Sequence, residues 1–365
     1  MAQQNLGAQD AAKHIEEEID QVLSYYPVGT LKKASTAAGG VMNENWFVDT
    51  DTGRYFLRRR SPFFSSDSTD FELQLIEHVS KLGFPTPRLI HTSVGGVYVN
   101  MDGRTWELYE YISGEPFQAE NLAQIGSAAK LLARFHKIAA GYHVNLKEGA
   151  ISHRKIDMST VSGMIEEFKE QAKGELKASA LGTLIEPGIT ALIEAQADLV
   201  LGGIQTLSGS LLTVIHGDFQ PSNVIFRGDE AIVLIDFGNA ALSYRTYDLA
   251  RAILSFSTLR PDYRSQSDLD PWMDMNRAKA FFRAYQADMP VGEAELQAIP
   301  ALIRGTFLFG ISYYMKIEED LTKKAALLIN AIRFIKWLDA SEDDLRSILL
   351  EEARSLRMQA EGDPD

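Results

Sequence analysis

One short stretch, residues 214–223 followed by 235–238, constrains this 365-residue chain more than any other. In it, Asp218 is followed five residues later by Asn223, and a second carboxylate, Asp236, comes after an intervening apolar segment. Two carboxylates brought to one centre repel each other without a cation, and Mg²⁺ prefers oxygen ligands, often one or two carboxylates together with substrate phosphates. The set therefore predicts a fold that brings the three side chains to a common centre.

The residues around this set predict the local structure that carries it. Residues 211–215 form an apolar run rich in β-branched side chains and predict a buried strand. Residues 224–226 predict a second strand, 227–230 a turn, and 231–235 a third strand that ends at Asp236. A strand, a loop and a hairpin are thus expected to position the polar side chains.

The spacing is typical of phosphoryl transfer from ATP, in which a loop Asp, an Asn five positions later and a further Asp act together. We expect Asp218 to accept the proton of an attacking hydroxyl, and Asn223 and Asp236 to hold Mg²⁺. The competing interpretation is that Asp218 and Asn223 only satisfy turn backbone, as Asp and Asn often do. The ordered set on strand, loop, strand, turn and strand disfavours it.

The residues His216-Gly217-Asp218, Asn223 and Ile235-Asp236-Phe237 resemble the Brenner motif of the aminoglycoside phosphotransferase and choline kinase-like superfamily. Tyr247-Asp248-Leu249-Ala250 resembles a further signature of that family, and the likeness runs from about residue 38 to 340. Within that superfamily, the sequence resembles most the homoserine kinases of type II, the N-acetylhexosamine kinases and the bacterial stress-response kinases.

The resemblance implies an α+β, two-lobed protein-kinase-like fold with ATP between the lobes. We expect an N-terminal lobe with an antiparallel sheet over residues 1–112, and a mainly helical C-terminal lobe over 113–365. The family positions also imply that Asp218 is the catalytic base and that Asn223 and Asp236 are the Mg²⁺ ligands.

Three further polar residues of the expected C-terminal lobe are interpreted as structural. His216 matches a family residue that supports the catalytic loop, and a backbone hydrogen bond is its expected contact. Asp248 is expected to orient that loop rather than to touch substrate. His136, on a helix expected over residues 120–139, is expected to be a satisfied core histidine.

A glycine-containing turn is expected near the start of the N-terminal lobe. Residues 39–45 include Gly40 and Asn43 and precede a predicted hairpin, with strands at 46–48 and 54–58. Such a turn can lay backbone N–H groups over phosphates. Two glycines alone are a weak signal, but a cationic strand follows them directly.

The returning strand carries three consecutive arginines, Arg58, Arg59 and Arg60. Kinase-like folds usually place there a Lys that pairs the α- and β-phosphates, and alignment with the family strand puts Arg58 in its place. Side chains alternate along a strand, so Arg58 and Arg60 share one face and Arg59 the other. Glu72, on a helix over 70–79, matches the family Glu that pairs with the strand cation. The alternatives are a solvated basic edge and a solvated Glu in the first helical turn.

The strand expected over 106–112 ends at a Ser-Gly turn and resembles the hinge of kinase-like folds. The resemblance implies that backbone groups of Glu110 and Ile112 contact adenine.

Composition excludes several classes of protein. The chain has no cysteine, so disulfides, thiolate catalysis and cysteine-ligated zinc are excluded, and a reducing cytoplasm is the expected location. The net charge of −14 argues against nucleic acid as a partner. No apolar run reaches the length of a membrane span, and no signal peptide is expected. Helices are expected over 9–24 and across most of 271–340, and a last helix is expected to start at Ser341.

These observations predict ATP- and Mg²⁺-dependent phosphorylation of a hydroxyl on a small polar metabolite: an amino alcohol, homoserine, an amino sugar or an aminoglycoside. A protein Ser/Thr kinase of the stress-response type and a nucleotide-binding pseudokinase scaffold are the alternatives. The intact Asp218, Asn223 and Asp236 argue against the scaffold, and the missing strand Lys argues mildly for it. A metal-dependent hydrolase built on His216 and Asp218 lacks a second His ligand near either motif. Oligomeric state is not readable from the sequence.

Overall fold

The structure is a computed structural model that describes residues 2–37, 43–62, 65–142, 155–156, 163, 166, 170, 188–259, 272–318 and 320–361. The chain divides into two compact units, of which the first takes the described residues up to Gly114 together with Val233–Gly238. The second takes the other described residues. None of the described helices has the length and apolarity that a membrane span needs.

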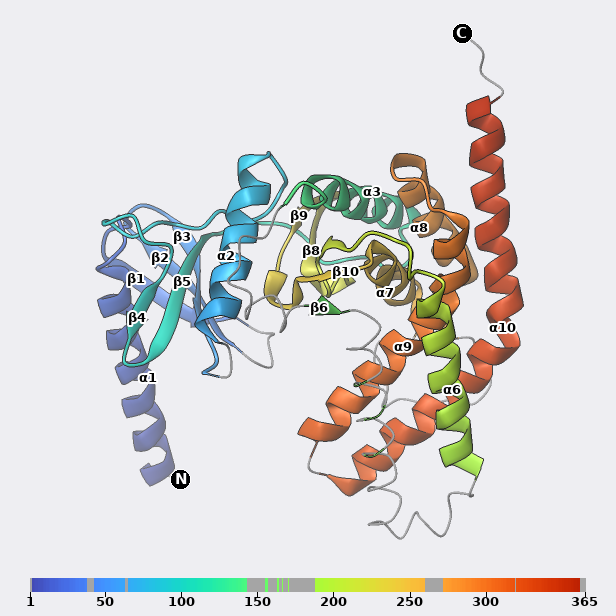
Figure 1. The fold of residues 1–365 in the computed structure, drawn as a ribbon. Helices are drawn as coiled ribbons and strands as arrows, with labels where there is room; N and C mark the ends of the chain where they lie inside the picture. Colours follow the sequence, from blue (N-terminus) through green and yellow to red (C-terminus); the bar gives the residue numbers. More distant parts are fainter. Residues whose placement is uncertain are drawn as a thin grey trace. The chain divides into compact units, whose positions relative to one another are not determined.

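The first unit is built on a five-stranded antiparallel sheet in the order β1-β2-β3-β5-β4 (Figure 1). Its elements are α1 (Ala2–Leu23), β1 (Leu31–Thr36), β2 (Glu44–Thr50), β3 (Arg54–Arg59), α2 (Ser66–Lys81), β4 (Val99–Met101) and β5 (Arg104–Glu110). The predicted hairpin is β2 and β3, whose register pairs Asn45 with Arg58.

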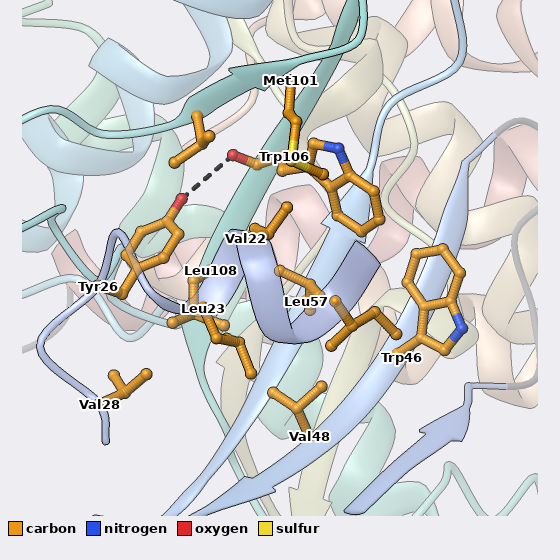
Figure 2. Packing of buried hydrophobic residues seen from close by; sticks show 12 residues of the cluster. Val22, Leu23, Tyr26, Val28, Trp46, Val48, Leu57, Met101, Trp106 and Leu108 are labelled. Atoms are coloured by element: carbon orange, nitrogen blue, oxygen red, sulfur yellow. Dashed lines mark hydrogen bonds between the residues drawn. The ribbon is translucent and has the colours of Figure 1, made fainter. Parts of the chain in front are cut away.

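An apolar core fills one face of this sheet. Figure 2 shows Val22 and Leu23 of α1 beside Leu57 of β3 and Trp106 of β5, all of them buried. Tyr26 donates a hydrogen bond from its hydroxyl to the carbonyl of Trp106 at 3.2 Å. The helix expected over 9–24 is therefore confirmed, and it closes this face of the sheet.

The opposite face of the sheet is polar at its centre, because alternation turns Arg58, Arg60 and Glu107 away from the apolar core. Helix α2 supplies Glu72 to this face through contacts with both arginines. The helix begins after Ser65, whose side chain accepts from Ser68 N. Its predicted apolar stripe is buried and consists of Phe71, Leu75, Ile76 and Val79.

The second unit is mainly helical, which together with the antiparallel sheet confirms the predicted α+β class. Its helices are α3 (Leu122–Ala139), α6 (Gly188–Gln205), α7 (Arg245–Ser257), α8 (Met275–Asp288), α9 (Glu293–Ile317) and α10 (Leu321–Glu361). Helix α3 packs on α8, and α9 packs on α6, α7 and α10 (Figure 1). The helix expected over 120–139 is confirmed.

Short strands frame the motif region. They are β6 (Lys155–Ile156), β7 (Thr213–Ile215), β8 (Val224–Arg227), β9 (Glu230–Leu234) and β10 (Ala241–Ser243). Strand β7 pairs antiparallel with β10, which pairs parallel with β6, while β8 and β9 form a hairpin. The three strands predicted around the motif are confirmed, the first of them starting two residues later than predicted.

Three features differ from the expectations. Strands β1 and β10 were not expected, because each is short and few of its side chains are large and apolar. No helix begins at Ser341, since α10 runs without interruption from Leu321 to Glu361. The sequence of α10 contains neither Gly nor Pro, so nothing in it ends the helix before Ser341.

Candidate functional site

The loop between β7 and β8 carries Asp218 and Asn223 and has one conformation-setting residue, Gly217. Its φ is +76°, and a Cβ built there would lie 2.0 Å from the carbonyl oxygen of Asn239. Only glycine therefore fits this position. A short 3-10 turn, Pro221–Asn223, then leads the chain into β8.

Asp248 of α7 holds this loop by its backbone. The side chain is fully buried and accepts hydrogen bonds from His216 N at 2.6 Å and Gly217 N at 2.8 Å. Burial alone would raise the pKa of Asp248, but the hydrogen bond and charge of His136, together with His216, outweigh burial and hold the pKa below its usual value. Asp248 is thus an ionised anchor for the loop, as expected.

The two histidines have the structural contacts that the sequence predicted. His136 Nε2 lies 3.1 Å from Oδ2 of Asp248, and Nδ1 lies 2.8 Å from the hydroxyl of Tyr285. An ionised carboxylate only accepts, so Nε2 is the donor. His216 accepts from Asp218 N through Nδ1 at 3.3 Å, and both rings are fully buried.

An aromatic core holds the loop from another side through Phe219, the residue after Asp218. Its ring is fully buried, with centroids 5.8 Å from Phe256 and 6.3 Å from Phe281. The packed side chain of Phe219 therefore fixes the backbone next to Asp218 in place.

The Asp218 carboxylate has different partners on its two oxygens. Oδ2 accepts from Asn223 Nδ2 at 3.0 Å and from Gln220 Nε2 at 3.1 Å. Oδ1 forms an ion pair with Nη2 of Arg251 on α7. Asn223 Nδ2 also donates to the carbonyl of Asp218 at 2.9 Å, so the amide nitrogen is used and its oxygen faces elsewhere.

In the first unit, a buried network surrounds Arg58 of β3 and Arg60, which directly follows the strand. Arg60 Nη1 lies 2.7 Å from Glu72 Oε2, and Arg60 also pairs with Glu107. Arg58 has longer contacts, 3.4 Å to Glu72 Oε1 and 3.6 Å to Asp236 Oδ1. Burial alone would lower the pKa of Arg58, but the surrounding groups, Asp236 and Glu72 among them, raise it, so the guanidinium stays charged.

The network confirms the predicted alternation along β3. Arg59 lies on the other face, where it pairs with Glu18 and Glu44 and stacks over Trp106, with its guanidinium carbon 5.0 Å from the ring centroid. The predicted ion pair between Arg58 and Glu72 is present. The solvated alternatives for both residues are wrong, because Glu72 is fully buried and only 10% of the Arg58 side chain is exposed.

Asp236 follows β9 in an unusual backbone conformation. Its φ is +64°, in the left-handed region that residues other than glycine seldom adopt. Its side chain remains 41% exposed even though Arg58 lies within 3.6 Å. Backbone conformations of this kind cluster at active sites and ligand clamps.

The other predicted nucleotide-site residues are placed as follows. Gly40 lies outside the described residues. Asn43 accepts from Ser61 N at 3.0 Å through Oδ1, which joins the start of the hairpin to its end. Glu110 ends β5, and its N–H donates to the carbonyl of Arg88, while Ile112 follows β5 and is half-buried.

The structure thus brings Arg58, Glu72 and Asp236 together in the first unit, and Asp218 and Asn223 together in the second. The sequence predicts a face for Arg60 but no partner, and it does not identify Glu107, Gln220 or Arg251 as contributors. The available signal for Arg251 was its place three residues after Asp248, which on a helix puts both side chains on one face.

The described residues contain no group of three or more His, Cys, Asp or Glu side chains arranged to hold a metal. The predicted ligands are instead one amide and one carboxylate. The amide oxygen of Asn223 and the carboxylate of Asp236 are oxygen donors of the kind that Mg²⁺ uses alongside substrate phosphates. The donor chemistry therefore fits the predicted ion.

Sequence comparison finds similarity to one family and to metabolic kinases. The model of a family described as "Phosphotransferase enzyme family" matches residues 33–296. The chain is 28% identical over 289 residues to a homoserine kinase of Bradyrhizobium sp. (strain BTAi1 / ATCC BAA-1182), covering 79% of this chain and 80% of that one. It is 25% identical over 329 residues to a homoserine kinase of Rhodopseudomonas palustris (strain ATCC BAA-98 / CGA009), covering 90% and 87%.

Solved structures with similar folds include a microcompartment-associated aminopropanol kinase, with a TM-score of 0.70 at 14% identity over 90% of this chain and 98% of that one. An amicoumacin kinase in complex with AMP-PNP and Ca²⁺ has a TM-score of 0.66 at 15% identity, covering 92% and 96%. An aminoglycoside phosphotransferase from Alicyclobacillus acidocaldarius has a TM-score of 0.62 at 20% identity, covering 94% and 96%. These likenesses confirm the predicted two-lobed kinase-like fold.

Proposed function

The chain belongs to the phosphotransferase enzyme family and is an ATP-dependent kinase that phosphorylates a hydroxyl group of a small metabolite; on that premise we propose that Asp218 is its catalytic base. A base must reach the hydroxyl proton within hydrogen-bond distance. The observation that carries this proposal is the fixed catalytic loop, in which Asp248 holds the backbone of His216 and Gly217.

The proposed role of the chain in catalysis is mainly positioning. Asp218 orients the acceptor hydroxyl and takes its proton as the hydroxyl oxygen bonds to the γ-phosphorus, while the bond from that phosphorus to the bridging oxygen breaks and ADP leaves. Asn223 and Gln220 hold one carboxylate oxygen of Asp218, so the other oxygen is the one that faces the hydroxyl. Fixing the reacting groups in this way lowers the entropic part of the barrier.

We propose that Asn223 and Asp236 hold Mg²⁺. When bound, the ion would neutralise charge on the phosphate oxygens. Asn223 has its amide nitrogen directed to Asp218, and this supports the use of its oxygen as a ligand. The exposed carboxylate of Asp236 supports its part in the same way.

Arg58 of β3 and Arg60, which directly follows β3, divide the work that one Lys does in other kinase-like folds. We propose that Arg60 holds Glu72, to which its contact is short, and that Arg58 neutralises the phosphates of ATP, because its own contacts are longer. Arginine stays charged at any relevant pH and can bind phosphate through two donors. Both residues keep their charge, so the missing Lys does not argue for an inactive scaffold.

The remaining nucleotide contacts are proposed from family position. Gly40 and Asn43 belong to the turn expected over the phosphates, and backbone groups of Glu110 and Ile112 are expected at adenine. The absence of cysteine fits a reducing cytoplasm as the place of action.

A coupled ADP-release assay with Mg-ATP tests the proposed function. The acceptors are amino alcohols, homoserine, hexosamines, aminoglycosides and a generic protein acceptor. We expect turnover with a small acceptor that stops when Mg²⁺ is chelated. Turnover with the protein acceptor and with none of the small acceptors would establish a protein kinase. ATP binding without turnover of any acceptor would establish a pseudokinase. Either result overturns the proposal.

A further inference from the structure

Arg251 reaches the proposed base from the helix that anchors the catalytic loop. It lies three residues after Asp248 on α7, and its Nη2 pairs with Oδ1 of Asp218. Its Nε is buried and donates to no acceptor in the part of the chain that the structure describes. The guanidinium therefore contacts the proposed base Asp218 through Nη2, while the neighbouring donor Nε has no acceptor among the described residues.

The acceptor hydroxyl and Arg251 compete for the same oxygen. Oδ2 of Asp218 already accepts from Asn223 and Gln220, whereas Oδ1 has Arg251 as its partner. A hydroxyl that approaches Oδ1 must therefore share or replace the guanidinium contact. An enclosed cation that loses its carboxylate is costly unless another anion takes its place.

We propose that Arg251 binds a carboxylate of the acceptor, and that the acceptor is therefore a hydroxy amino acid. Nε and Nη2 lie on one edge of the guanidinium and form a fork that accepts a carboxylate through two parallel hydrogen bonds. The acceptor brings the anion that releases Asp218 for its hydroxyl. This inference rests on the proposed function and names the substrate class of the same site.

The charges around Arg251 fit this assignment. Burial alone would lower the pKa of Arg251, but the charge of Asp218 raises it above the usual value, so the side chain is a fixed cation. Asp248, the one carboxylate on α7, is used by the loop backbone and His136. A permanent cation beside the base disfavours acceptors that carry only positive charge, such as aminoglycosides and simple amino alcohols.

Matched acceptor pairs test the inference in the full-length protein. Replacing the carboxylate by hydrogen turns homoserine into 3-amino-1-propanol, serine into ethanolamine, and threonine into 1-amino-2-propanol. The kcat/KM of each member is measured for the wild type, for Arg251→Gln and Arg251→Lys, and for Arg283→Gln as a control of equal charge change. Arg283 lies on α8 with 57% of its side chain exposed.

We expect the wild type to prefer the carboxylate member of at least one pair. Arg251→Gln should lower kcat/KM for that member by roughly 30- to 1,000-fold, mostly through KM, and spare its carboxylate-free partner. Arg251→Lys keeps the charge without the fork and should lose part of the preference. Arg283→Gln should retain it.

The contrary results are distinct. A wild type that turns over only carboxylate-free acceptors or only aminoglycosides overturns the inference and leaves the proposed function intact. An equal loss for both members of a pair in Arg251→Gln also overturns it, because the arginine would then act on Asp218 alone. Failure of every acceptor in a protein that still binds ATP overturns the proposed function and the inference with it.

Discussion

Two fully buried carboxylates, Glu72 in the first unit and Asp248 in the second, are held in different ways. Glu72 is held by side chains, with Arg60 at 2.7 Å and Arg58 at 3.4 Å. Asp248 is held by the backbone N–H groups of His216 and Gly217 together with one histidine. A backbone donor survives substitution of its residue, whereas a side-chain donor does not. The network around Glu72 therefore depends on the identity of its arginines, whereas the backbone donors to Asp248 depend on the path of the loop.

The same comparison separates anchoring contacts from contacts that can be exchanged. Arg60 and Asp248 have short contacts to fully buried partners. Arg58 has contacts of 3.4 and 3.6 Å, and Asp218 shares one oxygen with Arg251. Arg58 and Asp218 are therefore the residues whose contacts can be exchanged for contacts to a ligand, whereas Arg60 and Asp248 hold the structure around them. Substitutions at the two kinds of position should have different effects.

The largest loss of stability is expected from Arg60→Met, which leaves Glu72 and Glu107 buried without their main cation. Removing one partner of a buried ion pair costs about 3–5 kcal/mol. Urea unfolding measures the change, with Lys81→Met on the exposed side of α2 as control, for which a change of under about 0.5 kcal/mol is expected. A smaller loss for Arg60→Met than for Arg58→Met would reverse the assignment of anchor and ligand.

Asp248→Asn should destabilise the protein by about 2–3 kcal/mol. The amide can accept one of the two loop N–H groups, but its own NH₂ group then faces donors. We expect lower kcat as well, because the backbone beside Asp218 is no longer fixed. Asp198→Asn, on an exposed face of α6, is the matched control. A free energy of unfolding equal to that of the wild type in Asp248→Asn would show that the loop conformation does not depend on the Asp248 carboxylate.

Arg58→Met should leave the free energy of unfolding nearly unchanged, because Arg60 continues to hold Glu72. Its expected effect is a loss of about 10- to 100-fold in kcat/KM for ATP, the consequence of removing one charge-assisted hydrogen bond worth about 1.5–3 kcal/mol. Steady-state kinetics at saturating acceptor measures it. A loss of stability without a loss in ATP kinetics would make Arg58 a structural residue only.

The smallest expected effect is on how the free energy of unfolding falls as the pH is lowered into the acid range. The folded-state pKa of Asp248 lies below its unfolded value. Its contribution is therefore fully present above the usual Asp pKa of about 3.9 and is lost as pH falls toward the folded pKa. Urea unfolding from neutral pH into this window should show a steeper fall for the wild type than for Asp248→Asn. Parallel curves would mean that the pKa of Asp248 is not shifted.

The sequence predicted the elements in which chemistry and periodicity agree. The strands and loop around Asp218, the hairpin with Arg58 and the apolar stripe of α2 each have a strong local pattern. Strands β1 and β10 lack one, because pairing with neighbouring strands rather than their own apolar content stabilises them. The continuous α10 was missed because a local capping pattern at Ser341 does not by itself interrupt a helix.

The candidate site was predictable at residues whose role depends on type and spacing, and not where it depends on a long-range partner. Arg60 and Glu107 are 47 positions apart, and only the pairing of β3 with β5 brings them together. Arg251 meets Asp218 across 33 positions for a comparable reason, since α7 must first lie against the catalytic loop. No local pattern encodes the contact between Arg60 and Glu107, and the spacing of Arg251 from Asp248 indicates only the helix face on which Arg251 lies.

The measurement that tests the central claim most directly compares turnover and ATP affinity in Asp218→Asn. The substitution keeps the shape of the side chain and removes the proton acceptor. We predict a fall in kcat of about 10²- to 10⁴-fold with unchanged ATP affinity by equilibrium titration. Turnover close to that of the wild type would contradict the assignment of Asp218 as the base, and with it the account of how the loop is built.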